Sequence, residues 1–206
     1  AVLRAEGIDS PIKTIYLVAH SHLDIGYTNP PQAVEEEYKT RIDQEIAFAK
    51  QHPDFKWNIE ETWQLRHWMQ IGSREEIETL MGLIREGRIG LSGAHSTLHS
   101  SKAGIEELSR YLYDAEWLRR DHRLPIQTVF HNDSPGLPWS YPQTLAGAGI
   151  RYLVVGLNLF IGGGFDAPYH PYLFHWEGPD GSRVLTWVTW KGYYEATAYY
   201  GFARRA

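Results

Sequence analysis

The sequence predicts an α/β protein in which a parallel sheet is covered by crossover helices. Short apolar, β-branched runs alternate along the chain with stretches whose apolar side chains recur at helical spacing. This strand-then-helix order is typical of parallel sheets, because parallel neighbours need a long crossover connection. Hydrophobic residues make up 43% of the 206 residues, which is enough for a packed core.

The first expected strand covers residues 13–19, an apolar run suited to burial on both faces. Pro31 then favours the start of a helix, which Pro53 ends. The apolar positions of that helix are Val34, Tyr38, Ile42, Ile46 and Ala49. Residues 55–59 form the second expected strand, so one strand–helix–strand unit is predicted.

Ser73 and Glu76 have the spacing of a capping box and predict the start of another helix, which Gly87 ends. Its apolar face comprises Ile77, Leu80, Met81 and Ile84. One further helix face is formed by Ile105, Leu108, Leu112 and Ala115. The remaining expected elements are strands at 88–94, 127–131 and 152–157 and a short helix at 142–148.

Residues 172–176 and 183–188 flank the turn sequence Gly-Pro-Asp-Gly at 178–181, which predicts an antiparallel hairpin. Five parallel strands are too few to close an eight-stranded α/β barrel, which typically takes about 250 residues. We therefore expect residues 1–206 to be the N-terminal part of a parallel (β/α) barrel domain, incomplete in this chain, with an antiparallel hairpin near its end.

Composition excludes several functions. With 20 basic and 25 acidic residues the net charge is −5, which disfavours nucleic acid as a partner. The most apolar stretch, 152–165, is shorter than the roughly 20 residues that span a bilayer, so no membrane helix is expected. The absence of cysteine excludes thiolate zinc sites and a cysteine nucleophile. Any metal must be held by His and carboxylate side chains.

His20, His22 and Asp24 follow the first expected strand at alternate positions. If the strand continues, its period of two places all three on one face. The C-terminal edge of a parallel sheet is where ligands and chemistry collect. A metal site at this strand end is the prediction, and its alternative is a polar strand end with ordinary hydrogen-bonded histidines.

Asp133 lies where the fourth expected strand runs into a turn that contains Pro135 and Pro138. Its alternative role is that of a helix N-cap or Asx-turn residue before Pro135. Together with His22 and Asp24 it predicts a mixed nitrogen and oxygen site with open coordination, of the type that zinc accepts.

These residues resemble glycoside hydrolase family 38, the α-mannosidase family. The sequence HSHLDIGY at 20–27 is similar to the family's first-strand signature, and DSPG at 133–136 to its nucleophile segment. The resemblance implies that His22, Asp24 and Asp133 bind Zn2+, that Asp133 is also the nucleophile, and that Tyr27 lies under the sugar. The order and spacing of the match extend from Thr14 to about Ile150.

The resemblance further implies retaining hydrolysis of an α-mannoside-like carbohydrate on an α/β barrel. Asp133 would attack the anomeric carbon while a second carboxylic acid protonates the leaving oxygen. Pro135 and Leu137 depart from the family pattern, in which an aromatic residue and a His occupy these positions. The family's fourth ligand and its acid/base residue have no counterpart here, and we expect both beyond Ala206.

Tryptophans at 57, 63 and 68 surround the sequence Glu60-Glu61-Thr62, which follows the second expected strand. Core packing is the simpler explanation for these rings. Trp63 is nevertheless a candidate for binding substrate, because flat aromatic rings pack against the C–H faces of sugars.

Other functions fit parts of the same pattern. His20 and His22 resemble the first metal motif of amidohydrolases, which His131 would join. His95 and His99 stand at i and i+4, as in metal-dependent polysaccharide deacetylases, and face one way if the segment is helical. A non-catalytic carbohydrate-binding fragment, whose sugar-binding surface comprises Tyr27 and nearby tryptophans, is the third alternative.

Overall fold

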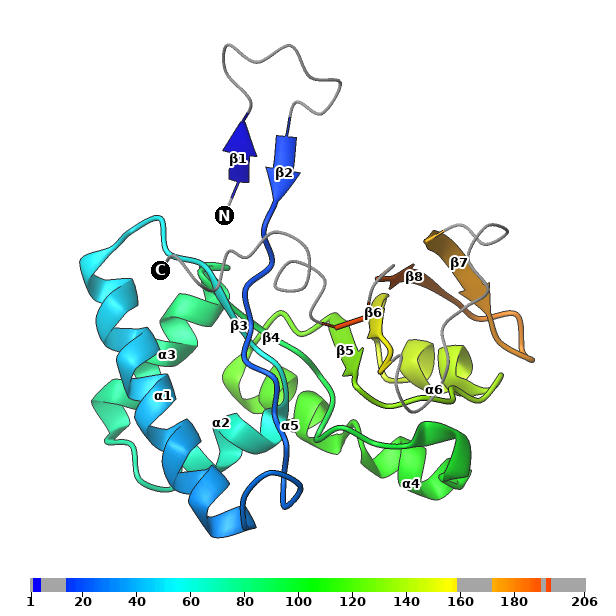
Figure 1. Ribbon diagram of the computed structural model, residues 1–206, viewed down its shortest axis with the longest axis horizontal. Helices are drawn as coiled ribbons and strands as arrows, with labels where there is room; N and C mark the ends of the chain where they lie inside the picture. Colours follow the sequence, from blue (N-terminus) through cyan, green and yellow to red (C-terminus); the bar gives the residue numbers. More distant parts are fainter. Residues whose placement is uncertain (1, 5–13, 159–171, 190–191, 194–206) are drawn as a thin grey trace. The chain divides into compact units, whose positions relative to one another are not determined.

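The computed structural model describes residues 2–4, 14–158, 172–189 and 192–193 (Figure 1). The chain divides into two compact units, Ala1–Leu91 and Ser92–Ala206. None of the helices in the described part of the chain has the length and apolar character needed to cross a membrane.

The first unit begins with β1 (Val2–Arg4) and β2 (Thr14–Tyr16), which pair antiparallel. This corrects the prediction of a strand over 13–19 buried on both faces. Tyr16 is 75% exposed and Val18 51% exposed, because β2 has the short β1 as its partner. Lys13 itself lies outside the described residues. In the described part of the chain, an isolated parallel bridge links His20 to Asn58 of the next strand along the chain.

Helix α1 (Pro31–Gln51) confirms the first predicted helix, with Pro31 at its first position. All five predicted apolar positions are buried, and Glu45 is buried beside them. The C-terminal end is held by Arg88, whose guanidinium donates hydrogen bonds to the carbonyl oxygens of Ala49 and His52. The α1 face thus follows directly from the spacing of apolar residues.

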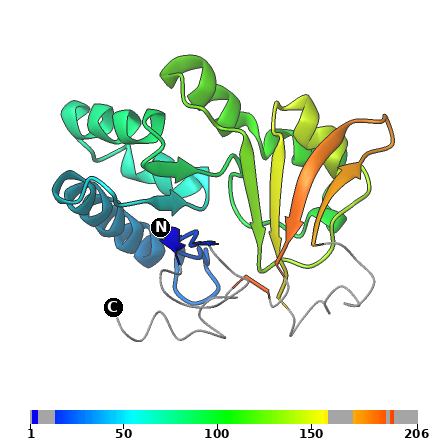
Figure 2. The ribbon, with the colours of Figure 1, turned by 90° about the horizontal axis from the view of Figure 1, so that it is seen from above.

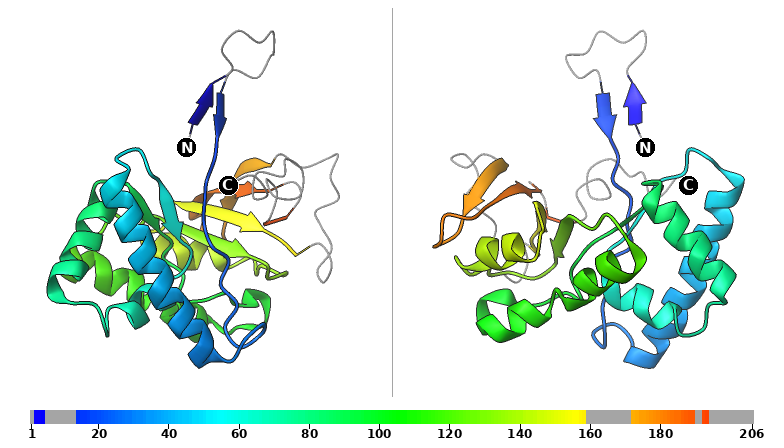
Figure 3. Two further views of the ribbon diagram at one scale, coloured as in Figure 1. Left: turned by 60° about the vertical axis from the view of Figure 1, so that its left-hand side comes forward. Right: turned by 180° about the vertical axis from the view of Figure 1, so that it is seen from behind.

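β3 (Trp57–Ile59) and β4 (Ile89–Leu91) form a parallel pair, and two helices connect them. Helix α2 (Thr62–Trp68) was not predicted; it starts at a capping box between Glu61 and Gln64. α3 (Arg74–Arg85) confirms the predicted capping box of Ser73 and Glu76. Gly87 adopts a φ of 67° after this helix, a conformation that glycine takes without strain. Figure 3 shows α1, α2 and α3 grouped beside the β3–β4 pair.

Three short helical elements follow early in the second unit, namely η1 (Ser100–Lys102), α4 (Ile105–Arg110) and α5 (Tyr113–His122). The predicted single helix face over 105–115 is therefore split between α4 and α5. Leu108, Leu112 and Ala115 are buried as expected, whereas Ile105 is 62% exposed. The break falls at Leu112, the N-cap residue of α5, whose φ and ψ are −106° and 2°.

The second unit contains a four-stranded sheet in the order β5-β6-β8-β7 (Figure 2). Its strands are β5 (Thr128–Asn132), β6 (Tyr152–Gly156), β7 (Leu173–Glu177) and β8 (Arg183–Val188). β5, β6 and β8 run parallel, and β7 is antiparallel to β8. Helix α6 (Tyr141–Gly147) packs against β8 and β7. Alternate residues such as Val129, Leu153 and Val184 are buried, so one sheet face forms the core.

The sheet differs from the prediction in two ways. First, the described strands form three separate sheets instead of one parallel sheet of five strands. Second, the hairpin is not simply an antiparallel addition, because its arm β8 pairs parallel with β6 over Tyr152–Val155. Burial of Val184, Thr186 and Val188 on the core face of β8 explains why this arm joins the parallel sheet.

Candidate metal and nucleophile residues

The segment from His20 to Asp24 is irregular backbone held by its neighbours in the first unit. Asn58 donates to the carbonyl oxygen of Ala19 from both its backbone N–H and its side-chain Nδ2, each at 3.0 Å. Leu23 is 1% exposed and packs with Val34 and Tyr38 of α1. Because Leu23 is buried in this apolar cluster, it anchors the segment between its two candidate ligands.

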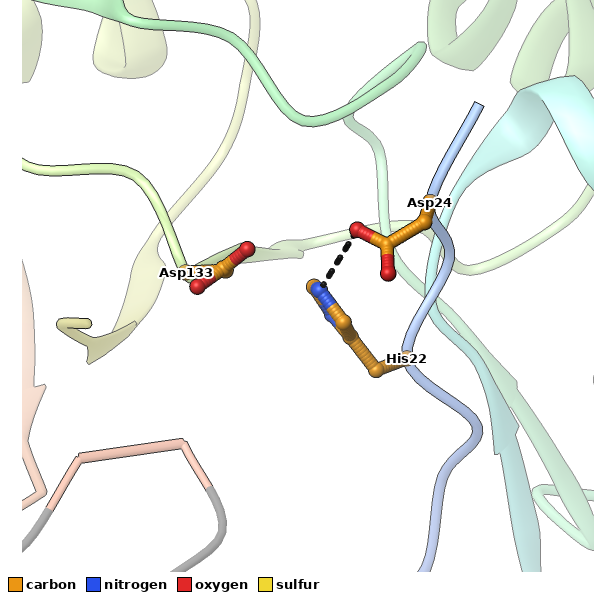
Figure 4. A group of neighbouring side chains, drawn as sticks. All are labelled: His22, Asp24 and Asp133. Atoms are coloured by element: carbon orange, nitrogen blue, oxygen red, sulfur yellow. Dashed lines mark ion pairs between the residues drawn. The ribbon is translucent and has the colours of Figure 1, made fainter. Parts of the chain in front are cut away.

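His22 and Asp24 face each other within this segment. The His22 Nε2 lies 3.5 Å from the Asp24 Oδ1, as the dashed line in Figure 4 marks. The side chain of His22 is 4% exposed and that of Asp24 is 27% exposed. An imidazole nitrogen and a carboxylate oxygen thus stand together at a position that solvent reaches from the Asp24 side.

Glu60 follows β3 directly and contacts the same segment from the protein interior. Its side chain is 1% exposed, and its two oxygens lie 3.3 Å and 3.4 Å from the His22 Nδ1. The backbone N–H of Leu23 donates to its Oε2 at 2.9 Å. From the sequence, Glu60 was expected only as part of a strand end, Glu60-Glu61-Thr62, that could line a cleft, and its contact with His22 was not predicted.

His20 belongs to the same group of side chains. Its Nδ1 lies 3.6 Å from the Glu60 Oε1. Burial lowers the pKa of His20, while the nearby Glu60 carboxylate acts in the opposite direction. The structure therefore groups His20, His22 and Asp24, with both histidines beside Glu60 and Asp24 beside the His22 Nε2, although the segment is not a regular strand.

Helix α1 fastens the backbone of this segment. The Tyr38 hydroxyl donates to the carbonyl oxygen of His22, and the Arg41 Nη1 donates to the Ser21 hydroxyl at 2.8 Å. Tyr38 is 6% exposed, and this burial raises its pKa. Contacts from α1 and from Glu60 hold the backbone on both sides of the His22 side chain.

The two aromatic candidates differ in exposure. Tyr27 is 88% exposed. Trp63 is half-buried in α2, packs against the cluster of Leu23, Val34 and Tyr38, and lies with its ring centroid 4.1 Å from that of His67. Core packing therefore accounts for part of the Trp63 surface, while Tyr27 presents its ring to solvent.

Asp133 follows β5 in the second unit and has a φ of 65°, which is uncommon for a residue other than glycine. Its backbone N–H donates to the carbonyl oxygen of Gly156 at 2.7 Å. The Asn158 Nδ2 donates to its Oδ1 at 2.6 Å. The N-cap alternative is wrong, because Ser140 is the N-cap residue of the following helix. Figure 4 also draws this carboxylate.

His131, the third histidine of the amidohydrolase alternative, is engaged within its own unit. It is 2% exposed, and its Nε2 lies 3.1 Å from the carbonyl oxygen of Ser134. Burial lowers its pKa to about 4. His131 therefore has the contacts of a neutral core histidine, with its ring packed edge-on against Tyr141.

In the deacetylase alternative, His95 and His99 face one way if the segment is helical. The segment between β4 and η1 is not helical. The His95 Nδ1 pairs with the Asp114 Oδ2 at 2.7 Å, and His99 is the exposed N-cap residue of η1. The two rings therefore do not share a helix face.

Several solved structures have a similar fold. An α-mannosidase from Enterococcus faecalis V583 matches with a TM-score of 0.67 and 17% identity over 83% of this chain. A protein in the glycosyl hydrolase family 38 from Enterococcus faecalis matches with a TM-score of 0.63 and 17% identity over 85% of this chain. The 4-α-glucanotransferase from Thermococcus litoralis matches with a TM-score of 0.64 and 18% identity over 90% of this chain. At these identities the likeness shows an α/β fold similar to theirs.

The matched part is short relative to those proteins. It spans 19% of each Enterococcus faecalis chain and 29% of the Thermococcus litoralis chain. No curated protein matches the sequence significantly. The family model described as the glycosyl hydrolases family 38 N-terminal domain matches residues 13–205. The chain therefore belongs to glycosyl hydrolase family 38, as part of its N-terminal domain.

Proposed function

We propose that residues 1–206 are the N-terminal part of the (β/α) barrel of a zinc-dependent retaining glycosidase that cleaves α-mannosidic or related α-glycosidic bonds. Family membership supports a glycosidase. The observation that supports metal dependence is the pair of His22 and Asp24, which face each other in the family's first-strand motif. The substrate class is an α-mannoside-like carbohydrate.

The donor set of the first unit fits a zinc ion. Zinc takes imidazole nitrogen and carboxylate oxygen, and ligating histidines usually place their second ring nitrogen against a carboxylate or carbonyl group. His22 has this arrangement, with Nε2 toward Asp24 and Nδ1 toward Glu60. His22, Asp24 and Asp133 would hold the ion. When bound, zinc would coordinate adjacent sugar hydroxyls and offset negative charge beside the nucleophile.

Asp133 is proposed as the nucleophile. Its position directly after β5 suits this role, because residues at the C-terminal ends of barrel strands face the substrate. Asn158 orients the carboxylate by donating to Oδ1. Asp133 would attack the anomeric carbon, the leaving oxygen would take a proton from a second carboxylic acid, and water would then release the sugar.

Tyr27 and Trp63 are proposed as substrate-binding residues. A sugar presents flat C–H faces that pack on aromatic rings. The 88% exposure of Tyr27 leaves its ring available for such a contact. Trp63 would use the part of its ring that the apolar cluster leaves uncovered.

Zinc stoichiometry, measured by elemental analysis on the purified chain, tests this proposal. Asp133→Asn and Asp24→Asn should each lose zinc, and His20→Ala should retain it. In a protein that also carries the second carboxylic acid, hydrolysis of an aryl α-mannoside should fall at least about a thousandfold with Asp133→Asn, because the nucleophile is removed. Zinc that survives both Asp→Asn changes but leaves with His20→Ala would overturn the proposal in favour of an amidohydrolase site.

A further inference from the structure

We propose that Glu60 is a positioning residue, which fixes the tautomer and the ring orientation of His22 and so prepares His22 and Asp24 to bind a divalent cation. The inference concerns the first unit alone. It deepens the proposed function, on which it rests, because that function makes His22 and Asp24 metal ligands.

The contacts of His22 distinguish its two ring nitrogens. Nδ1 has hydrogen-bond geometry to the Glu60 Oε1 at 3.4 Å and lies 3.3 Å from Oε2, whereas Nε2 lies at an ion-pair distance of 3.5 Å from the partly exposed Asp24 Oδ1. A neutral imidazole has one N–H donor and one lone pair, and a carboxylate is an acceptor only. With Glu60 accepting at Nδ1, the ring proton is placed on that atom. The lone pair then lies on Nε2, the atom that stands beside the other candidate ligand.

Glu60 also fixes the backbone between the two ligands. Its Oε2 accepts the N–H of Leu23 at 2.9 Å in the protein interior. Leu23 separates His22 from Asp24, so one carboxylate holds both the ring and the chain that carries the neighbouring ligand. Such supporting contacts set the geometry of a metal site as much as the ligands themselves do.

The burial of Glu60 is consistent with this role. A carboxylate that is 1% exposed costs free energy unless donors surround it. The Leu23 N–H, the His22 ring and the His20 ring, whose Nδ1 is 3.6 Å away, supply these neighbours. All three belong to the segment that carries the candidate ligands, so the cost of burying Glu60 is offset there.

Two other buried carboxyl groups of the first unit have different surroundings. Glu61 accepts at the start of α2, where it forms the capping box with Gln64. Glu45 lies on α1 and lines a small cavity together with Ser21, Asn58 and Gln64. Glu45→Gln is therefore a control for Glu60→Gln, since it makes the same substitution at another buried site of the same unit, where the side chain has other neighbours.

The first readout is the His22 tautomer in metal-free, 15N-labelled protein, from two-bond 1H–15N correlations. The unmodified chain should show the Nδ1–H form. Glu60→Gln should shift His22 toward a mixture of tautomers, because the carboxylate bias is lost, and Glu45→Gln should leave the ring unchanged. A His22 pattern in Glu60→Gln identical to that of the unmodified chain would overturn the proposal.

The second readout is zinc affinity, measured by competition with a chromogenic chelator. Loss of an outer carboxylate partner typically weakens metal binding about ten- to a hundredfold, and this range is expected for Glu60→Gln. Glu45→Gln should stay within about twofold, and Glu60→Asp should recover part of the loss because it keeps the charge. Equal zinc affinity of Glu60→Gln and the unmodified chain would contradict the role.

The two readouts separate this inference from the proposed function. If the unmodified chain binds no zinc, His22, Asp24 and Asp133 by themselves do not hold the ion, while the tautomer measurement still decides whether Glu60 orients His22. If zinc binds and neither readout responds to Glu60→Gln, the metal site stands and the role of Glu60 is overturned. Should Glu60→Gln fail to fold, the same comparison is made between Glu60→Asp and Glu45→Gln.

Discussion

At the scale of single residues, short polar contacts from outside the segment hold the candidate ligands. The Tyr38 hydroxyl reaches the His22 carbonyl from α1, and Glu60 reaches the His22 ring from the end of β3. Neither residue is near His22 in sequence: Tyr38 is 16 positions away and Glu60 is 38. Motif spacing identifies His22 and Asp24 as candidates, but it contains no information about these partners.

Tyr38→Phe tests the contact from α1. The change keeps the buried ring and removes the hydroxyl that donates to the His22 carbonyl oxygen. The free energy of unfolding should fall by about 1–2 kcal/mol, because a buried acceptor loses this donor. Urea unfolding at pH 7 measures the effect. Tyr27→Phe is the control, since that side chain is 88% exposed, and an equal loss in both variants would contradict the explanation.

At the scale of elements, local signals determined the helices better than the strands. The apolar spacing of α1 and the capping box of α3 lie within a few residues, and both are present as predicted. The strand β8 was expected only as a hairpin arm, yet it also pairs parallel with β6. Its parallel partner is chosen by burial of one face against the core, which local sequence does not specify.

The capping box of α3 gives a prediction at this scale. The Ser73 hydroxyl accepts the Glu76 N–H at 3.2 Å, so Ser73→Ala should lower the free energy of unfolding by about 1 kcal/mol. Thr79→Ala is the matched control, because that exposed hydroxyl donates back to the Glu75 carbonyl oxygen within the same helix and caps no helix end. Chemical denaturation of both variants distinguishes a lost cap from a lost hydroxyl.

At the scale of the whole molecule, the free energy of unfolding should depend on pH, because each unit buries a titratable side chain and the pKa values of these two groups shift in opposite directions. Burial raises the pKa of Glu45 to about 8 and lowers that of His131 to about 4. In the folded state the carboxyl of Glu45 stays neutral up to about pH 8. Its stabilising contribution to the free energy of unfolding is therefore complete below its ordinary pKa and is lost as pH rises through about 8. The contribution of His131 is lost as pH falls toward 4.

Glu45→Gln tests the alkaline side of this profile. The melting temperature of the unmodified chain should fall by about 4–8 °C between pH 6 and pH 9, which corresponds to about 2 kcal/mol for a chain of this size. The variant should show a smaller fall, because glutamine has no proton to lose. Thermal unfolding followed by circular dichroism measures both melting temperatures. An equal fall in the unmodified chain and in Glu45→Gln would exclude Glu45 as the cause of the loss of stability at alkaline pH.

The sequence by itself determined the α/β class, the helices with strong caps or apolar faces, and the family, through HSHLDIGY and DSPG. The class and the helices depend on neighbouring residues, so they can be read from spacing, and the family was inferred from the resemblance of these two motifs. Only the tertiary structure revealed the helix α2, the parallel pairing of β8 and the Glu60 carboxylate behind His22. The physical reason is that a buried polar group or a strand edge forms its hydrogen bonds with the groups that packing brings near it. Those groups are distant in the chain, so local sequence does not identify them.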